Sequence, residues 1–194
     1  MTRKRINKQK AIDSTLALCL KHSFHGTSID AITAATGMSK ATIYRHFNSK
    51  EQLIEDALNY YKRDYLLELS TGYNSPTLSL EEKLSLPFKM LKETFDKELF
   101  MGCCIQKALN EYCNENSVIS NVCLTFKQER TELLETLLLN NHISRAKERS
   151  VQGELIFSGL LSTLQVNDSS DLIDITLNMY LNIMSKCDWN PSKY

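Results

Sequence analysis

The chain has 194 residues, of which 42% are hydrophobic and 24% charged, so it can bury a core and wholesale disorder is excluded. Its 6 Gly and 3 Pro are too few for the turns of an all-β sandwich and favour long helices. No apolar run reaches the ~20 residues of a membrane span and no apolar signal segment is evident, so we expect a cytoplasmic protein. Its 6 Cys and 4 His lack zinc-ligand spacing, and we expect neither a metal nor another cofactor.

Apolar spacing and capping residues predict an all-α fold. Thr27 or Ser28 is expected to cap the second helix and Gly37 to end it, while Pro87 should kink or divide a later helix. A loop containing Gly72 is expected over residues 71–77. The expected helices cover about residues 7–23, 28–37, 39–47, 50–70, 80 onward, 103–112, 117–139, 145–166 and 170–186.

The net charge of zero hides an uneven distribution along the chain. Residues 1–50 contain nine Lys and Arg against only Asp13 and Asp30, so this segment carries +7 and the remainder carries −7. A basic end on an acidic body is typical of a protein that binds a polyanion such as nucleic acid. The alternative is a basic tail without a dedicated partner.

Residues 28–47, with the sequence SIDAITAATGMSKATIYRHF, form the most informative stretch. Ile32, Met38 and Ile43 supply apolar contacts where two short helices cross, and Gly37 permits the tight turn between them. The second of these helices carries a mixture of base readers and phosphate donors that suits a DNA major groove. Any tight corner between two helices could produce a similar pattern, so the stretch alone is moderately specific.

The longer arrangement GTSIDAITAATGMSKATIYRHFNSKEQLI resembles the N-terminal DNA-binding domain of TetR-family transcriptional regulators. The resemblance covers about residues 8–55 and departs at Thr33, where the family usually has Ala. It implies a helix-turn-helix DNA-binding domain over residues 1–50 and a helical ligand-binding and dimerisation domain over residues 51–194. The implied protein is a homodimeric repressor that binds a palindromic operator and is released by an unknown small-molecule effector.

The resemblance also implies roles for single residues. Lys40, Ala41 and Thr42 match positions that commonly meet bases, and Tyr44 matches one that packs on the DNA backbone or a thymine methyl group. The others match phosphate contacts or cap the two short helices. The predicted DNA-binding residues are Ser28, Ser39, Lys40, Ala41, Thr42, Tyr44, Arg45, His46 and Lys50.

Aromatic residues and Met are frequent in the middle helices, where the family can hold an apolar ligand cavity. Because these side chains are uncharged, we expect an apolar or amphipathic effector, although any one of them could simply be a core residue. The predicted ligand-binding residues are Tyr61, Tyr65, Phe88, Phe95, Met101, Tyr112 and Phe126.

The last two helices have a broader apolar surface than an ordinary amphipathic helix. The excess predicts burial on two sides, by the protomer core and by a partner in a four-helix interface. The alternative is that both helices are central in a monomer. The predicted dimer-interface residues are Phe157, Leu160, Leu161, Leu164, Leu177, Tyr180, Leu181 and Met184.

Two other hypotheses stay open. Cys103 and Cys104 follow Gly102 at a predicted helix N-terminus, where the helix dipole favours a thiolate, so the repressor could sense electrophiles or oxidants. The alternative interpretation is that both cysteines are buried core residues with unreactive thiols. A helical interaction protein without specific DNA binding is the other hypothesis. An enzyme is not expected, because no GxSxG, HExxH, P-loop or GxGxxG motif is evident.

Overall fold

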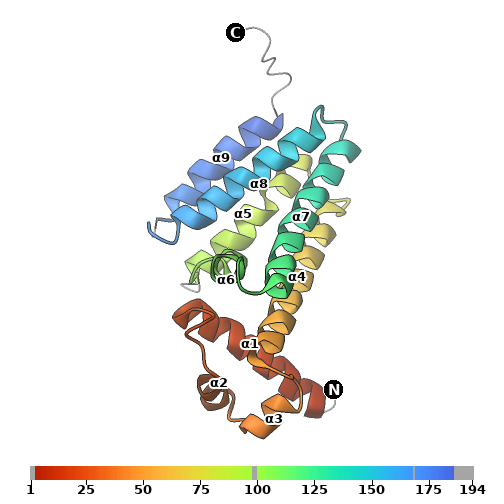
Figure 1. Cartoon of the computed structure of the whole chain (residues 1–194). Helices are drawn as coiled ribbons and strands as arrows, with labels where there is room; N and C mark the ends of the chain where they lie inside the picture. The colour runs from red at the N-terminus through yellow and green to blue at the C-terminus, as the bar shows by residue number, and fades with distance from the viewer. Residues whose placement is uncertain (1–2, 98–99, 168, 186–194) are drawn as a thin grey trace. The chain divides into compact units, whose positions relative to one another are not determined.

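The computed structural model describes residues 3–97, 100–167 and 169–185, and these residues form helices without a single strand (Figure 1). The all-α prediction is therefore confirmed. None of the described helices combines the length and the apolarity that a membrane-spanning segment requires. The helices are α1 (Arg3–His22), α2 (Ile29–Thr36), α3 (Lys40–Tyr44), α4 (Lys50–Tyr73), α5 (Leu80–Asp96), α6 (Cys104–Tyr112), α7 (Ser117–Asn140), α8 (Ala146–Thr163) and α9 (Asp171–Ser185).

The chain folds into two compact units, and each unit combines segments that are far apart in the sequence. Unit 1 consists of Met1–Tyr65 and Met101–Phe126, so α6 and the start of α7 join the first three helices. Unit 2 consists of Leu66–Phe100 and Lys127–Tyr194. Both α4 and α7 are continuous helices that contribute to both units. The predicted division after residue 50 falls at the start of α4, inside unit 1, and stays a prediction about independent domains.

The helix-turn-helix in unit 1 is determined by local signals in the sequence. The Ser28 hydroxyl accepts a hydrogen bond from the Ala31 N–H at 3.1 Å, which identifies Ser28 rather than Thr27 as the N-cap of α2. Gly37 ends α2 with a left-handed φ of 69°, a conformation that glycine adopts without steric cost. Ser39 then caps α3 through the Thr42 N–H at 3.2 Å.

A small apolar core fixes the angle between these helices. It contains buried residues from α1, from the helix-turn-helix and from the start of α4, with Met38 packed at its edge. Burial of this apolar surface is what holds the two short helices in place, since helices of this length are unstable alone. The buried residues are Ala11, Ile12, Ile32, Ile43, Phe47, Leu53 and Ala57.

Unit 2 packs α5 and α8 against α9. At its centre the Phe88 ring lies 5.1 Å from that of Phe157 and 5.0 Å from that of Tyr180, measured between centroids. Pro87 is buried beside this cluster and does not divide α5, so that part of the prediction is wrong. Burial of the proline ring offsets the hydrogen bond that proline cannot donate within the helix.

The predicted loop at 71–77 is also partly wrong, because α4 continues to Tyr73 and includes Gly72. A Cβ atom at Gly72 would lie 2.3 Å from Cδ1 of Leu86, so the glycine allows α4 and α5 to approach closely. Glycine at this position therefore reflects helix packing rather than a turn.

Candidate DNA-binding site

One side of α3 is solvent-exposed, and its opposite side is in the core. Ile43 of α3 is buried, and so is Phe47, which follows the helix and donates its N–H to the Ile43 carbonyl at 3.0 Å. Tyr44 is 49% exposed, and Lys40, Ala41 and Arg45 are also exposed, while Thr42 is half-buried. The fold thus brings most of the predicted contact residues onto one accessible surface. We call the residues from Lys40 to Arg45, Ile43 excepted, the recognition face.

The two capping serines flank this surface. Ser28 and Ser39 are both exposed, and the Ser39 hydroxyl lies 3.0 Å from that of Thr42. Each serine oxygen accepts from a backbone N–H of its own helix, so its hydrogen can still be donated outward. Hydroxyl donors at such positions commonly fix the register of a protein on DNA through phosphate oxygens.

Lys40 at the start of α3 forms an ion pair with Asp30 of α2, with 2.7 Å between Nζ and Oδ1. Hydrogen bonding to the Asp30 carboxylate, together with its charge, raises the pKa of Lys40, so its ammonium stays charged. Both side chains are exposed, and such surface pairs contribute little to stability. Lys40 can therefore exchange Asp30 for a guanine edge without unfolding the motif.

Two predicted phosphate contacts are positioned differently from the rest. His46 is half-buried, and its ring lies 6.2 Å from that of Phe47. Lys50 is half-buried, and its ammonium donates to the backbone carbonyls of Phe24 at 3.2 Å and His25 at 3.3 Å. Lys50 thus stabilises the turn after α1, a role that its position at the start of α4 did not indicate.

We expect Lys50→Ala to reduce the free energy of unfolding by about 1–2 kcal/mol, because two carbonyls lose a charged donor. Urea denaturation at pH 7 measures this change. Lys89→Ala, which removes an exposed lysine from α5, is the matched control and should leave the stability within about 0.5 kcal/mol of the wild type. An unchanged unfolding midpoint for Lys50→Ala would argue that the ammonium is free for phosphate.

The seven predicted ligand-binding residues are divided between the two units, five in unit 1 and two in unit 2. Tyr61, Tyr65 and Phe126 cluster in unit 1, with ring centroids 5.3 to 6.0 Å apart, and Tyr112 packs separately against Phe24 and His25. In unit 2, Phe88 belongs to the core and Phe95 packs on Phe100. Met101 is exposed. The ligand assignment of these residues stays a prediction.

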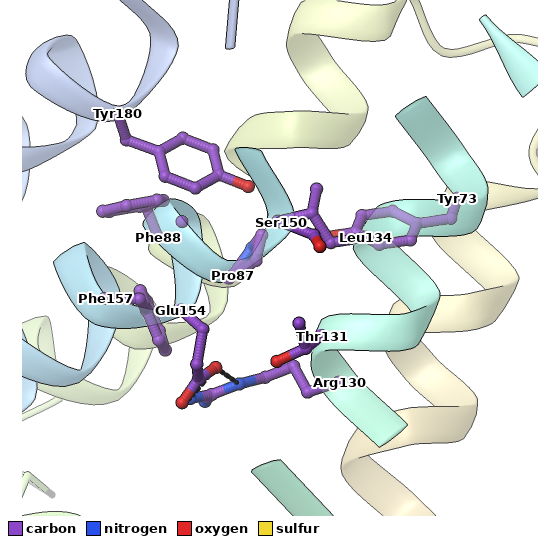
Figure 2. A pocket seen from close by; sticks show the side chains of 11 residues that line it. Tyr73, Pro87, Phe88, Arg130, Thr131, Leu134, Ser150, Glu154, Phe157 and Tyr180 are labelled. Carbon is purple, nitrogen blue, oxygen red and sulfur yellow. Dashed lines mark hydrogen bonds and ion pairs between the residues drawn. The ribbon is translucent and has the colours of Figure 1, made fainter. Parts of the chain in front are cut away.

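Unit 2 contains a pocket that includes only Phe88 of the predicted set (Figure 2). Its free space is about 20 Å³, which is room for roughly one water molecule, against the several hundred Å³ of ordinary ligand sites. An effector would have to widen it. The pocket is lined by Tyr73, Pro87, Phe88, Arg130, Thr131, Leu134, Ser150, Gly153, Glu154, Phe157 and Tyr180.

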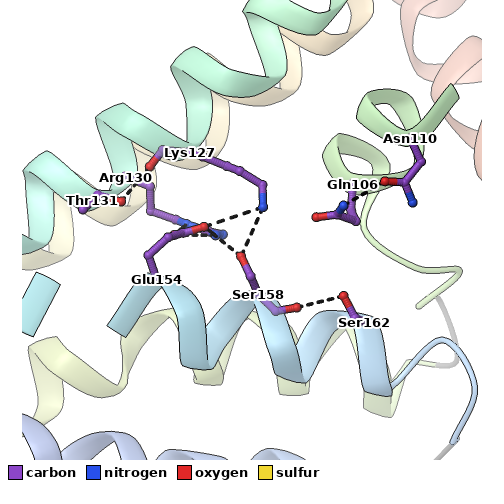
Figure 3. Close-up of polar contacts among 8 residues, drawn as sticks. All are labelled: Gln106, Asn110, Lys127, Arg130, Thr131, Glu154, Ser158 and Ser162. Carbon is purple, nitrogen blue, oxygen red and sulfur yellow. Dashed lines mark hydrogen bonds and ion pairs between the residues drawn. The ribbon is translucent and has the colours of Figure 1, made fainter. Parts of the chain in front are cut away.

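An ion pair that the sequence analysis missed lies in this pocket. Arg130 of α7 donates to both carboxylate oxygens of Glu154 of α8 over 2.7 to 2.9 Å, and its guanidinium lies 4.9 Å from the Phe157 ring centroid. Lys127 and Ser158 extend the network at 3.3 Å from each other, and the Ser158 hydroxyl donates to Glu154 at 2.8 Å (Figure 3). The lining of this pocket is thus amphipathic rather than uncharged.

Of the two thiols at the start of α6, that of Cys104 does not fit the reactive-cysteine hypothesis. Cys104 is buried, and burial raises its pKa well above that of an ordinary thiol. Burial likewise raises the pKa of Cys19 to about 11. Desolvation therefore outweighs the helix dipole, which the sequence analysis expected to favour the thiolate.

We expect Cys19 and Cys104 of the native protein to resist a thiol reagent at pH 8, because almost no thiolate is present and neither sulfur is accessible. Exposed Cys113 should react in the native state. Site-resolved mass spectrometry before and after unfolding in urea measures both classes. Rapid labelling of Cys104 in the folded protein would contradict its assignment as an inert core thiol and support the thiol-sensor hypothesis.

The predicted dimer-interface residues lie mostly inside unit 2. Leu177 and Leu181 are half-buried, and the other six are buried within the protomer. Other apolar side chains of the same two helices reach the surface: Leu155 is 68% exposed, Ile175 62% and Met179 50%. The apolar surface that the protomer leaves exposed on these two helices is thus formed by residues other than the predicted ones.

The N-terminal part of the chain is similar in sequence to known bacterial regulatory proteins. Residues 11–57 match the model of a family described as bacterial regulatory proteins, tetR family. The biofilm operon icaADBC negative transcriptional regulator IcaR of Staphylococcus epidermidis is 33% identical over 64 residues, 31% of this chain and 34% of IcaR. The uncharacterised regulator YerO of Bacillus subtilis is 39% identical over 54 residues, 28% of this chain and 19% of YerO. The chain thus spans about a third or less of these relatives.

Similarities at lower identity extend over most of the chain. The transcriptional repressor DhaR of Mycobacterium sp. is 20% identical over 158 residues, which is 81% of this chain and 78% of DhaR. The structure of SCO4454, a TetR-family regulator of Streptomyces coelicolor, matches 92% of this chain and 94% of its own with a TM-score of 0.82 at 17% identity. The structure of the reduced form of NemR from E. coli matches 93% of this chain and 98% of the NemR chain, with a TM-score of 0.85 at 15% identity. At these identities the structures establish the fold alone.

Proposed function

Through residues 11–57 the chain belongs to the TetR family of bacterial regulatory proteins, and we propose that it is a cytoplasmic transcriptional repressor that binds a palindromic operator as a homodimer. The recognition face of α3 carries this proposal. It lies within the matched segment, and its exposed Lys40, Tyr44 and Arg45 are residue types that can contact bases or phosphates, next to the buried Ile43 and Phe47.

The positive charge of residues 1–50 supports a DNA duplex as the partner. The first 50 residues carry +7, whereas the rest of the chain carries −7. Positive charge attracts the phosphate backbone irrespective of sequence, and the base edges in the major groove supply discrimination. Two copies of α3 related by a two-fold axis would read two half-sites about one DNA turn apart, or ~34 Å, or somewhat more.

We propose that the partner protomer docks on the exposed side of α8 and α9. Leu155, Ile175 and Met179 supply apolar surface there. Gly159 is exposed, and a Cβ atom at this position would meet no atom of the protomer, so a partner helix could approach closely. The eight residues that the sequence analysis assigned to the interface would then support this surface from within, although Leu177 and Leu181 can also contact the partner.

The repressive outcome and the effector belong to the same proposal. The names of IcaR and DhaR describe a negative regulator and a repressor. We propose that an apolar or amphipathic small molecule enters unit 2 where Phe88, Leu134 and Phe157 adjoin the Arg130–Glu154 pair. Such a molecule would release the operator only by binding one of two conformations more tightly than the other.

Retention of duplex fragments from a genomic pool, followed by sequencing, tests the proposed function. We expect enrichment of a near-palindromic motif and an affinity that falls steeply with salt. Recovery of fragments without a shared motif, at the affinity of random duplex, would instead support the helical interaction protein.

A further inference from the structure

The turn between α1 and α2, residues 23–27, is held by residues that lie more than 80 positions later in the chain. The Glu111 carboxylate of α6 accepts the Phe24 N–H at 2.9 Å with Oε1 and the His25 N–H at 2.7 Å with Oε2. Two successive backbone N–H groups that point at one carboxylate form a small anion-binding nest. The anion that fills this nest is part of the protein itself.

Cations satisfy the carbonyl groups of the same region. Lys107 of α6 donates to the Leu20 carbonyl near the end of α1 at 2.8 Å. Lys50 of α4 donates to the carbonyls of Phe24 and His25. The polar backbone groups at the end of α1 are thus paired with side chains of opposite charge from two other helices of unit 1.

Aromatic packing adds to this arrangement. Phe24 is fully buried and packs edge-on against Tyr112 of α6, with 6.3 Å between ring centroids. The His25 ring lies 4.7 Å from that of Tyr112 and contacts the Glu111 carbonyl and the Glu115 carboxylate, each at 3.2 Å. The end of α6 and the residues that follow it therefore contact Phe24 and His25 of the turn.

The backbone of the turn needs such support. Ser23 has a φ of 73°, a left-handed conformation that is uncommon for residues other than glycine. A Cβ atom at Gly26 would lie 2.3 Å from the His22 carbonyl oxygen, so the chain passes close to the end of α1. Buried Thr27 and the N-cap Ser28 follow directly, so the direction of this turn decides where α2 begins.

We infer that Glu111 is a positioning residue for operator binding, which rests on the proposed function. By holding the turn in one conformation, its carboxylate fixes the angle between α1 and α2 and hence the placement of the recognition face. Without it, two adjacent N–H groups lose a charged acceptor, and the left-handed conformation of Ser23 loses part of its support. DNA affinity then falls although no residue that faces DNA has changed.

The test compares Glu111→Gln and Glu111→Ala with the wild type in binding to the enriched operator and to random duplex. We expect both variants to lose about tenfold or more in operator affinity, or about 1.4 kcal/mol, with little change for random duplex. Glu68→Gln, which removes an exposed carboxylate from α4, is the charge-matched control and should bind as the wild type does.

A second measurement separates positioning from general stability. Formate can occupy the space of the missing carboxylate, so it should restore part of the operator affinity of Glu111→Ala relative to chloride at equal ionic strength. It should leave the wild type unchanged. Wild-type operator affinity in Glu111→Gln would overturn the inference alone, as would equal losses on operator and random duplex that formate does not reverse. A wild-type protein that prefers no duplex would overturn the proposed function as well.

Discussion

Replacing Leu155 by Glu should abolish operator binding while the protomer stays folded. The side chain is 68% exposed on α8, so a folded protomer tolerates a carboxylate there. In the proposed dimer the same carboxylate would be buried and unpaired, at a cost of several kcal/mol. A monomer would present only one copy of the recognition face and would lose about 100-fold or more in operator affinity. Sedimentation equilibrium and fluorescence anisotropy on the same samples measure both effects.

Two control variants make this result specific to the interface. Leu67→Glu places the same charge at a residue of α4 that is 63% exposed and should remain a dimer that binds DNA. Leu160→Glu places it in the core of unit 2 and should unfold the protein rather than dissociate it. A Leu155→Glu protein that remains dimeric would show that the partner docks elsewhere. A wild-type protein that is monomeric and still binds the operator tightly would contradict the proposal that it binds DNA as a dimer.

The second large effect concerns the recognition face. A Tyr44→Ala, Arg45→Ala double variant should bind the operator at least about 100-fold more weakly, because each half-site loses two contacts worth about 1 kcal/mol or more each. Both side chains are exposed, so the unfolding free energy should change by less than about 0.5 kcal/mol. Anisotropy titrations at fixed salt, together with urea denaturation, measure affinity and stability.

Lys40→Ala distinguishes base reading from phosphate binding at the same surface. If Lys40 donates to a guanine, the variant should lose preference at one position of each half-site, at about 1–3 kcal/mol, and keep its affinity for random duplex. Lys89→Ala removes a lysine from α5 and should bind the operator normally. For the Tyr44→Ala, Arg45→Ala variant, operator binding at wild-type affinity would mean that α3 does not enter the major groove.

The helix-turn-helix could be predicted closely because its signals are local. Ser28, Gly37 and Ser39 act on backbone groups within four residues, so their effect can be inferred without knowing the rest of the fold. The prediction of a turn at Gly72 is wrong because this glycine lies within α4 and leaves room for Leu86 of the next helix, a contact that the local sequence does not show. A glycine that permits close packing and one that forms a turn are identical in sequence.

Contacts between distant segments explain the other differences. Apolar periodicity shows that α8 and α9 have wide apolar surfaces, but it does not tell which side the protomer buries, so it could not show that Leu160 is buried within the protomer and Leu155 is exposed. The Arg130–Glu154 pair depends on the register between α7 and α8. The Glu111 carboxylate meets the turn after α1 only because α6 joins unit 1.

Footprinting of the enriched duplex, combined with its binding stoichiometry, tests the central claim most directly. We expect two protomers per duplex and two symmetry-related protected segments on one face of the DNA, with centres about one turn apart or somewhat more. The Tyr44→Ala, Arg45→Ala variant should leave both segments unprotected at the same concentration. A single protected segment bound by one protomer, or protection that the double variant retains, would contradict a dimer that reads DNA through α3.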